Sequence, residues 1–389
     1  MAGYLFAFSD RESLLETINR GTYSTLVKPT WRAETTATFA DFATMKPGDN
    51  VYFFSKREVF GIGEITEITD GEAFLDIFPG ASAGSPKEVP DLLERCLPSA
   101  EIAPSSERIR RWIISFKPAP HFFSNGVDMD DLLASNPSDF RSLRVFWRRS
   151  FIKFDDDENR AFMTALMRAN IEALQYPLPS QIIESSNEAL LSELRKQDLS
   201  QLKPNFSQYL VKKRTASGAL TAEMDLEAGI LFQLSNHEVG SIETFGTWNY
   251  LSHQVHASPM KAVGYMDKMD IFGYSLIPGY PIVKSYLVAE LKKDKATSDD
   301  LPQLMKYVDW IRQEYANGNY GIIRAFLVAH EFDMDDILAH IEEIERTYLS
   351  NRRPPITQKW GDVTLVKYHV EETGIIRFSA SSLVPFLPK

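Results

Sequence analysis

The chain of 389 residues has a single cysteine, Cys96, which excludes an internal disulfide and a cysteine-based zinc site. It has no apolar run near the ~18 residues that a membrane-spanning helix needs. Its first ten residues include Asp10 and no leading basic stretch, and such a start makes a poor signal peptide. We therefore predict a cytoplasmic protein with no membrane partner.

Positive charge is also scarce, because 42 Lys and Arg residues face 53 Asp and Glu residues and give a net charge of −11. This balance excludes a protein that coats nucleic acid through its net charge, although a local basic cleft would still bind phosphates. The sequence has no Walker-type phosphate loop and no Gly-x-Ser-x-Gly elbow. Energy coupling is therefore not encoded in this chain.

An apolar content of 44% and a charged content of 24% are those of a folded protein, and the length suits two or three domains. The clearest break in composition lies at 176–205, where prolines stand at both ends of a polar stretch with a short amphipathic pattern. We predict a first domain at 1–175, a helical linker at 176–215 and a second domain at 216–389.

The first domain is predicted to be mixed α/β and rich in strands. Short apolar runs indicate the strands, and helix-start residues before an amphipathic pattern indicate the helices. The expected strands span 4–8, 51–54, 59–68 and 111–116, and the expected helices span 9–18 and 156–167.

Residues 4–8 and 46–65 resemble the PUA-like barrels of the EVE/YTH kind. They contain an aromatic strand, a Lys-Pro-Gly-Asp turn, a second aromatic strand and a glycine-containing strand. The resemblance implies a PUA-like β-barrel domain that holds a modified or flipped base in an aromatic pocket. Trp31 and Phe8 are candidate pocket residues, as are the two phenylalanines at 122–123. The alternative for all of these rings is burial in the core, which is the default for aromatic side chains.

The second domain is predicted to combine helices and strands in the order helix, strand, strand, helix, strand. Apolar spacing gives the helices, and continuous apolar runs give the buried strands. The expected elements are a helix over 221–232, strands over 263–274 and 283–292, a helix from 300 and a strand over 322–329.

Glu290 and Lys292 fall on one face of the strand at 283–292, because side chains alternate along a strand. If the strand carrying Asp270 pairs antiparallel with it, all three side chains reach one place. Two converging carboxylates repel each other unless a divalent cation lies between them, and oxygen ligands select Mg²⁺ or Mn²⁺. Lys292 would then orient or deprotonate the attacking water, or neutralise phosphate oxygens.

Two acids on the first helix of this domain, Glu223 and Glu227, lie four residues apart on one face. Glu223 would bind the metal through water; alternatively Glu227 takes its place, or both are surface charges. His253 and His256 have no third ligand beside them in the sequence, and we expect them to be structural or exposed.

A strand aspartate, a Glu-x-Lys strand and a helix with Gln-x-x-x-Tyr resemble the PD-(D/E)xK phosphodiesterase superfamily, near the EndoMS-type mismatch endonucleases and the Shedu-type defence nucleases. The resemblance implies a restriction-endonuclease-like αβββαβ domain that hydrolyses phosphodiesters. It assigns Asp270 and Glu290 as metal carboxylates and Lys292 as the catalytic lysine. It also places an accessory acid and two residues of the following helix at the site: Glu223, Gln303 and Tyr307.

Basic residues in two places are candidates for nucleic-acid contact. Arg148 and Arg149 stand beside aromatic residues, which suits phosphate contact and stacking, but exposed arginines on a strand or helix are an equal alternative. Lys293 and Lys295 follow the predicted active site and would line a DNA channel. The basic pair at 352–353 is expected in a solvated loop.

Together these features predict a Mg²⁺-dependent (or Mn²⁺-dependent) DNA endonuclease with an N-terminal recognition domain, acting in antiviral defence, restriction or DNA repair. Because one site cuts one strand, double-strand cleavage would require a homo-oligomer, a dimer or tetramer. The alternatives are a non-catalytic nucleic-acid-binding module on a nuclease-like fold and an RNA-processing nuclease. Two final strands, 362–370 and 375–378, either extend the nuclease sheet or form an oligomer contact.

Overall fold

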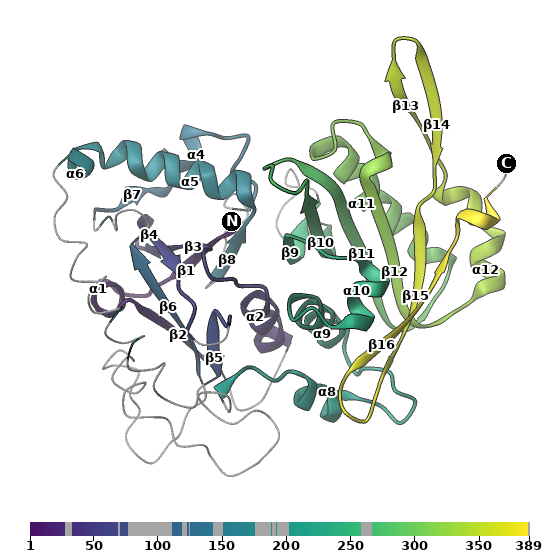
Figure 1. Ribbon diagram of the computed structural model, residues 1–389, viewed down its shortest axis with the longest axis horizontal. Helices are drawn as coiled ribbons and strands as arrows, with labels where there is room; N and C mark the ends of the chain where they lie inside the picture. The colour runs from purple at the N-terminus through teal and green to yellow at the C-terminus, as the bar shows by residue number, and fades with distance from the viewer. Residues whose placement is uncertain are drawn as a thin grey trace. The chain divides into compact units, whose positions relative to one another are not determined.

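The structure is a computed structural model of the whole chain. It describes residues 1–27, 33–68, 71–76, 111–118, 123, 125–142, 151–175, 188, 192, 202–257 and 267–387. Two compact units form, one from Met1–Thr38 and Met45–Asn205 and the other from Phe39–Thr44 and Phe206–Lys389. Both units combine helices with β-sheet, so the chain has the mixed α+β class that the sequence predicts (Figure 1).

Among the described residues of the first unit, eight strands form one sheet, whose main path runs β2-β6-β4-β3-β1-β8, with β5 on β6 and β7 on β4. The strands are β1 (Gly3–Ala7), β2 (Thr22–Leu26), β3 (Asn50–Ser55), β4 (Glu58–Ile65), β5 (Phe74–Asp76), β6 (Arg111–Pro118), β7 (Val127–Asp128) and β8 (Phe151–Phe154). The helices are α1 (Arg11–Arg20), α4 (Met129–Ser135), α5 (Asp156–Ala169) and α6 (Ile171–Gln175). Helix α2 (Ala33–Ala43) begins in this unit, and its residues from Phe39 onward belong to the second unit.

This sheet is curved into a half-barrel. The ring centroids of Phe6 on β1 and Tyr23 on β2 lie 3.9 Å apart, although three strands separate β1 from β2 along the sheet. Alternation along β1 turns Phe6 to this aromatic inner face and Leu5 to the other face, where α4 and α5 pack (Figure 1). Helix α5 begins where the Asp155 side chain accepts a hydrogen bond from the Glu158 backbone N–H.

Six strands form the main sheet of the second unit, counted over its described residues, in the order β16-β15-β12-β11-β10-β9. They are β9 (Tyr250–His256), β10 (Lys268–Leu276), β11 (Val283–Ala296), β12 (Ile323–Phe332), β15 (Val363–Val370) and β16 (Ile376–Ser382). The helices are α8 (Ser207–Lys213), α9 (Glu223–Ser235), α10 (Val239–Phe245), α11 (Leu301–Glu314) and α12 (Met334–Ala339).

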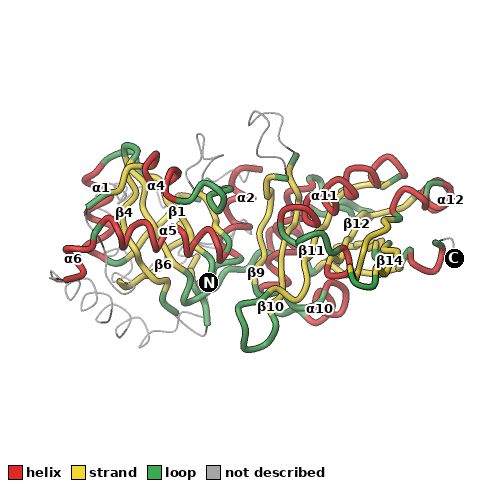
Figure 2. The backbone as a smooth tube through the Cα atoms, turned by 90° about the horizontal axis from the view of Figure 1, so that it is seen from above, coloured by secondary structure: helices red, strands yellow, loops and turns green. Residues whose placement is uncertain are grey.

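Strands β9, β10 and β11 are antiparallel neighbours, whereas β11 and β12 run parallel. A parallel pair needs a crossover, and α11 supplies it; Figure 2 shows α10 and α11 on opposite sides of the sheet. Pro302 stands in the first turn of α11, where its missing N–H costs no hydrogen bond.

The two final strands extend the sheet of the second unit. Strand β15 pairs parallel with β12, and β16 pairs antiparallel with β15, which decides the alternative that the sequence left open. Strand β9 is absent from the order read from the residues alone. A separate hairpin of β13 (Arg346–Arg352) and β14 (Pro355–Trp360) projects from this unit (Figure 1). None of the helices in the described ranges is long and apolar enough to cross a membrane.

Replacing Gly273 by alanine should destabilise the second unit. A Cβ at this position of β10 would lie 2.7 Å from the backbone oxygen of Tyr250 and 3.0 Å from Leu251 Cδ2, so the sheet must shift. We expect the free energy of unfolding of the full chain, measured in urea, to fall by roughly 1–3 kcal/mol, which is the usual cost of overpacking.

Gly240→Ala is the matched control, because a Cβ there meets only Arg377 Nη1 at 4.0 Å. Alanine in a helix is favoured over glycine by roughly 0.5–1 kcal/mol, so this variant should unfold at equal or higher urea. Equal stability of the two variants would contradict the packing described for β10.

Candidate active site

A row of polar side chains crosses three neighbouring strands of the second unit. Gln254 lies on β9, Asp270 on β10 and Glu290 on β11. Ile271, which follows Asp270, pairs with His253 of β9 on one side and with Ala289 of β11 on the other. Because the register of antiparallel strands steps in opposite directions, Asp270 stands opposite both Gln254 and Glu290, and its chain neighbours Met269 and Ile271 are buried.

Glu290 is only 1% exposed, and a carboxylate buried this deeply needs partners. Its Oε1 accepts a hydrogen bond of 2.8 Å from Lys292 Nζ, on the same strand face. Lys292 Nζ also lies 3.5 Å from Asp300 Oδ1. Among the described residues, no group donates to Glu290 Oε2. Burial raises the pKa of Glu290, and Lys292 opposes that rise.

Asp270 lies at the end of the paired segment of β10 and β11. Its Oδ2 accepts a hydrogen bond of 2.9 Å from the backbone N–H of Leu291, and its Oδ1 accepts one of 3.1 Å from Gln254 Nε2. Burial, followed by the charges of Glu290 and Glu227, raises the pKa of Asp270 to about 8. The row therefore concentrates negative charge that its own hydrogen bonds do not neutralise.

Gln254 connects the row to helix α9. Its Nε2 lies between two carboxylates, 3.1 Å from Asp270 Oδ1 and 3.0 Å from Glu227 Oε2. Its backbone φ of 50° is in the left-handed region, which residues other than glycine adopt at a cost of about 1–3 kcal/mol. The surrounding contacts hold Gln254 in this conformation, and so fix the orientation of Asp270.

His253 is held between Glu227 and one further carboxylate of the second unit, that of Asp41. Its Nδ1 lies 2.6 Å from Glu227 Oε1, and its Nε2 lies 3.1 Å from Asp41 Oδ1. Burial opposes a charge on this imidazole, but Asp41 and Glu227 outweigh burial and raise the pKa of His253 to about 10. The ring is therefore an imidazolium that balances part of the buried negative charge.

The two acids of α9 have different surroundings. Glu227 is buried and hydrogen-bonded to His253 and Gln254, and it supports Asp270 through Gln254. Glu223 is exposed at the first position of α9, where its charge acts on Glu290. Glu227 is therefore no surface charge, and Glu223 is the acid of α9 with access to solvent beside the row.

Helix α11 adds the two residues that the sequence pattern predicted. The Gln303 side chain is exposed, and its Nε2 donates to the hydroxyl of the buried Tyr307 at 3.0 Å. Burial, opposed by Gln303 and reinforced by Glu290, raises the pKa of Tyr307 to about 12. The Tyr307 hydroxyl therefore lies within the field of the acidic row.

The predicted nucleic-acid contacts are only partly described. Lys295 Nζ is paired with Asp333 Oδ2 at 2.6 Å, and Lys293 is paired with Asp294. Both lysines are at least 40% exposed at the side chain. Arg148 and Arg149 lie outside the described residues.

Of the candidate pocket aromatics in the first unit, Phe8 is half-buried. Its ring packs edge-to-face on Tyr23 and Phe53 of the inner aromatic face. Phe123 is buried in the core under α4 and α5. Trp31 and Phe122 lie outside the described residues.

The residues of the row fit a divalent cation. Glu290 Oε2 is a buried carboxylate oxygen for which the described part of the chain offers no donor. This oxygen and the raised pKa of Asp270 both indicate a place for positive charge. In the described ranges, no three His, Cys, Asp or Glu side chains are placed so that they could hold a metal by themselves. Mg²⁺ is commonly held by one or two carboxylates and completes its shell with water and substrate oxygens, which matches the pair present.

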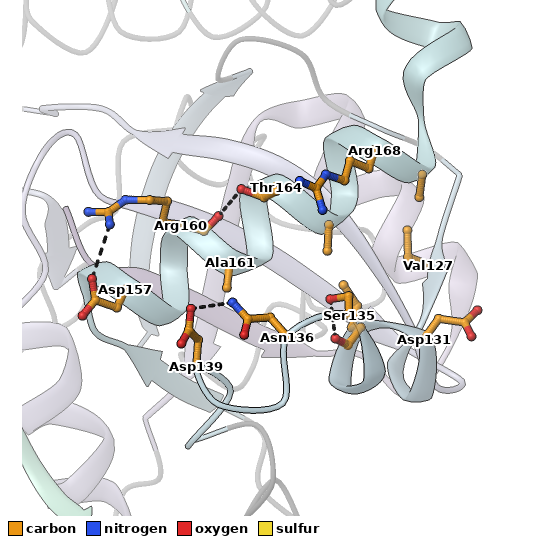
Figure 3. Close-up of a pocket in the computed structure, with 13 residues that line it drawn as sticks. Val127, Asp131, Ser135, Asn136, Asp139, Asp157, Arg160, Ala161, Thr164 and Arg168 are labelled. Atoms are coloured by element: carbon orange, nitrogen blue, oxygen red, sulfur yellow. Dashed lines mark hydrogen bonds and ion pairs between the residues drawn. The ribbon is translucent and has the colours of Figure 1, made fainter. Parts of the chain in front are cut away.

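A separate pocket of about 500 Å³ lies between α4 and α5 in the first unit (Figure 3). Its polar side chains bind one another: Arg160 lies 3.4 Å from Asp157, and Asn136 donates to Asp139 at 2.5 Å. None of the predicted site residues lines it.

Comparison with known proteins leaves the family of the chain undetermined. No protein family matches it, and no curated protein matches it. Among solved structures, a crystallised protein of Pseudomonas putida matches with 14% identity over 42% of this chain and 98% of its own, at a TM-score of 0.26. A likeness at that score carries no argument about fold or function.

Sequence reasoning noted His253 but expected a structural or exposed residue, and it missed Gln254 and Asp41. The only local signal is a polar stretch, Ser252 to Gln254, in the middle of a strand. Nothing near Asp41 in the sequence indicates that it meets His253.

The imidazolium of His253 predicts a specific pH dependence of stability. Its folded-state pKa of about 10 exceeds the ordinary value of 6.5, so its stabilisation is complete below pH 6.5 and is lost as pH rises through about 10. At pH 6 we expect the unfolding free energy of wild type to be a few kcal/mol higher than that of His253→Gln. This figure follows because each unit of pKa shift corresponds to about 1.4 kcal/mol. Urea unfolding at pH 6, 8 and 10 should show this gap closing.

His237→Asn is the control, because His237 is exposed and asparagine tolerates its φ of 56°. Its stability should follow wild type across the same range. A His253→Gln gap that stays constant or widens towards pH 10 would contradict the charged pairing.

Proposed function

We propose that the chain is a Mg²⁺-dependent (or Mn²⁺-dependent) DNA endonuclease whose active site is built on Asp270, Glu290 and Lys292. One observation carries the proposal: among the residues that the structure describes, no group donates to the buried Glu290 Oε2, which lies beside a second carboxylate in the same cross-strand row. Burying such charges without a counter-ion costs several kcal/mol per ion. A hard dication removes most of that cost, and a site for one beside a lysine suits phosphodiester hydrolysis.

Each residue of the site has a role in this proposal. Asp270 and Glu290 would hold the ion, and Glu223 would reach it through water. Bound Mg²⁺ lowers the pKa of a coordinated water and stabilises charge on a phosphate oxygen. Lys292, held by Glu290 at 2.8 Å, brings positive charge to the phosphate, and Gln254 keeps Asp270 in place.

The two predicted site residues of helix α11 are proposed to position the substrate. Gln303 is exposed and tied to Tyr307, whose hydroxyl faces the row, so this pair can contact a phosphate beside the metal. Lys293 and Lys295 are proposed to contact the DNA backbone next to the site by exchanging their exposed carboxylate partners for phosphates, because exposed ion pairs are weak.

The first unit is proposed as a PUA-like recognition domain for a modified base or mismatch, in defence, restriction or repair. The curved sheet supports this, because Phe8 and Tyr23 are half-buried at the edge of its aromatic inner face and a half-exposed ring can stack on a base. Phe8, at the half-buried edge of this face, is the described residue best placed to contact a base. A dimer or tetramer would be needed for cutting both strands.

Substituting Lys292 should strongly slow cleavage. We expect Lys292→Ala to lower the cleavage rate of plasmid DNA in Mg²⁺ by at least about 100-fold, the lower bound for losing a positioned charged group at the reacting centre. Lys284→Ala, an exposed lysine on the same strand, should cut like wild type.

The substrate decides between the alternatives. Duplex DNA and RNA of one sequence would be compared in Mg²⁺, with modified and unmodified plasmid as further substrates. Cleavage of RNA alone would favour an RNA-processing nuclease. No cleavage of any substrate by wild type, with nucleic-acid binding intact, would leave a non-catalytic binding module.

Metal binding tests the site independently of activity. Titration calorimetry with Mn²⁺ should give binding to wild type and at least tenfold weaker binding to Asp270→Asn, which removes one carboxylate charge. Glu331→Gln, an exposed acid on β12, is the control and should bind like wild type. Equal binding by all three proteins would place the metal elsewhere.

A further inference from the structure

The projecting hairpin β13–β14 is a basic segment of the second unit, in which Lys359 is paired with Glu345 at 3.0 Å. Residues 346–360 contain four Lys and Arg residues and no Asp or Glu, in a chain whose net charge is −11. Arg353 is exposed at the turn, where the sequence predicted a solvated loop. Nearly all described side chains of the hairpin are at least partly exposed, so this positive segment faces solvent.

The base of the hairpin is firmly attached. Arg346 forms a two-pronged ion pair with Asp309 of α11, with Nε–Oδ1 at 2.9 Å and Nη2–Oδ2 at 3.1 Å. Trp360, at the other end of the hairpin, is buried and donates from its indole N–H to the Ile323 carbonyl at 3.1 Å. One strand is therefore anchored to α11 and the other to the start of β12, and both ends of the arm are attached to the second unit.

A groove of about 910 Å³ lies along the hairpin and the segment that joins α11 to β12. No acidic residue lines it, whereas amides and hydroxyls dominate its walls. Its lining consists of Arg312, Asn317, Gly318, Asn319, Gly321, Ile322, Thr347, Tyr348, Leu349, Ser350, Asn351, Thr357 and Gln358. Arg312 is exposed, with its guanidinium 5.5 Å from the ring centroid of Tyr320.

Charge and chemistry of this surface favour duplex DNA over a protein partner. The major groove of B-DNA is about 12 Å wide and admits a two-stranded β-ribbon. Asparagine and glutamine amides pair with adenine edges, and arginine pairs with guanine or phosphate. Protein interfaces instead gather aromatic and aliphatic anchors. Two aliphatic side chains, Leu349 and Ile356, are exposed on this hairpin, where they stand among amides and hydroxyls.

We propose that the β13–β14 hairpin is a DNA-reading arm that enters the groove of a duplex, with Arg353 on the phosphates and Gln358 on base edges. The inference rests on the proposed function, which supplies DNA as the partner. Tyr286 and Glu290 of β11 pair with Ile323 and Leu327 of β12. The base of the arm, at Ile323, is therefore about 13 Å along the sheet from Glu290, or roughly four base pairs.

Binding to a labelled 30-base-pair duplex, without divalent metal and at several salt concentrations, tests the arm separately from cleavage. Arg353→Ala should weaken binding at least threefold and reduce the slope of log K against log salt by about one. Gln358→Ala should weaken binding with an unchanged slope, because base contacts release no counterions. Arg377→Ala, an exposed arginine on β16, is the control and should match wild type.

Several outcomes would overturn the inference. The first is that both arm variants bind DNA with the affinity and salt slope of wild type, and the second is that wild type binds no duplex. The third is a changed molar mass of the arm variants in light scattering, which would make the arm a contact between copies. Thermal unfolding at the wild-type temperature shows that the variants are folded. If the arm variants lose binding but wild type cuts no DNA in Mg²⁺, the nuclease proposal fails and the DNA-reading arm stands.

Discussion

The mutual repulsion of Asp270 and Glu290 is the constraint around which the second unit is arranged. Adjacent antiparallel strands place the two carboxylates in one cross-strand row, and burial keeps water from screening their charges. Lys292 satisfies one oxygen of Glu290, and no described residue donates to the other. A dication between the two acids would complete this arrangement.

The rest of the site holds this unfavourable arrangement in place. Gln254 bridges Asp270 and Glu227, and the His253 imidazolium offsets Glu227 from the other side. Removing one member of such a network leaves a buried charge without a partner, so the residues stabilise one another as a set. Stability is thereby given up at one place in the fold to keep two acids together, as is common at active sites.

Local pattern was sufficient to predict part of this site. Alternation along β11 correctly placed Glu290 and Lys292 on one face, and the apolar run before them indicated burial. Gln254 and Asp41 could not be predicted, because they meet the site through strand pairing and through a segment far away in the sequence. The spacing of Glu223 and Glu227 put both on one face, but only the packing of α9 shows which is buried.

Anomalous scattering of Mn²⁺, in crystals of the full chain soaked with the metal, would locate the ion. We expect a peak between Asp270 and Glu290, with an oxygen of each carboxylate about 2.0–2.3 Å away, near the usual distance for a small hard dication. A peak elsewhere in the molecule, with these two carboxylates bound only to protein groups and water, would contradict this expectation.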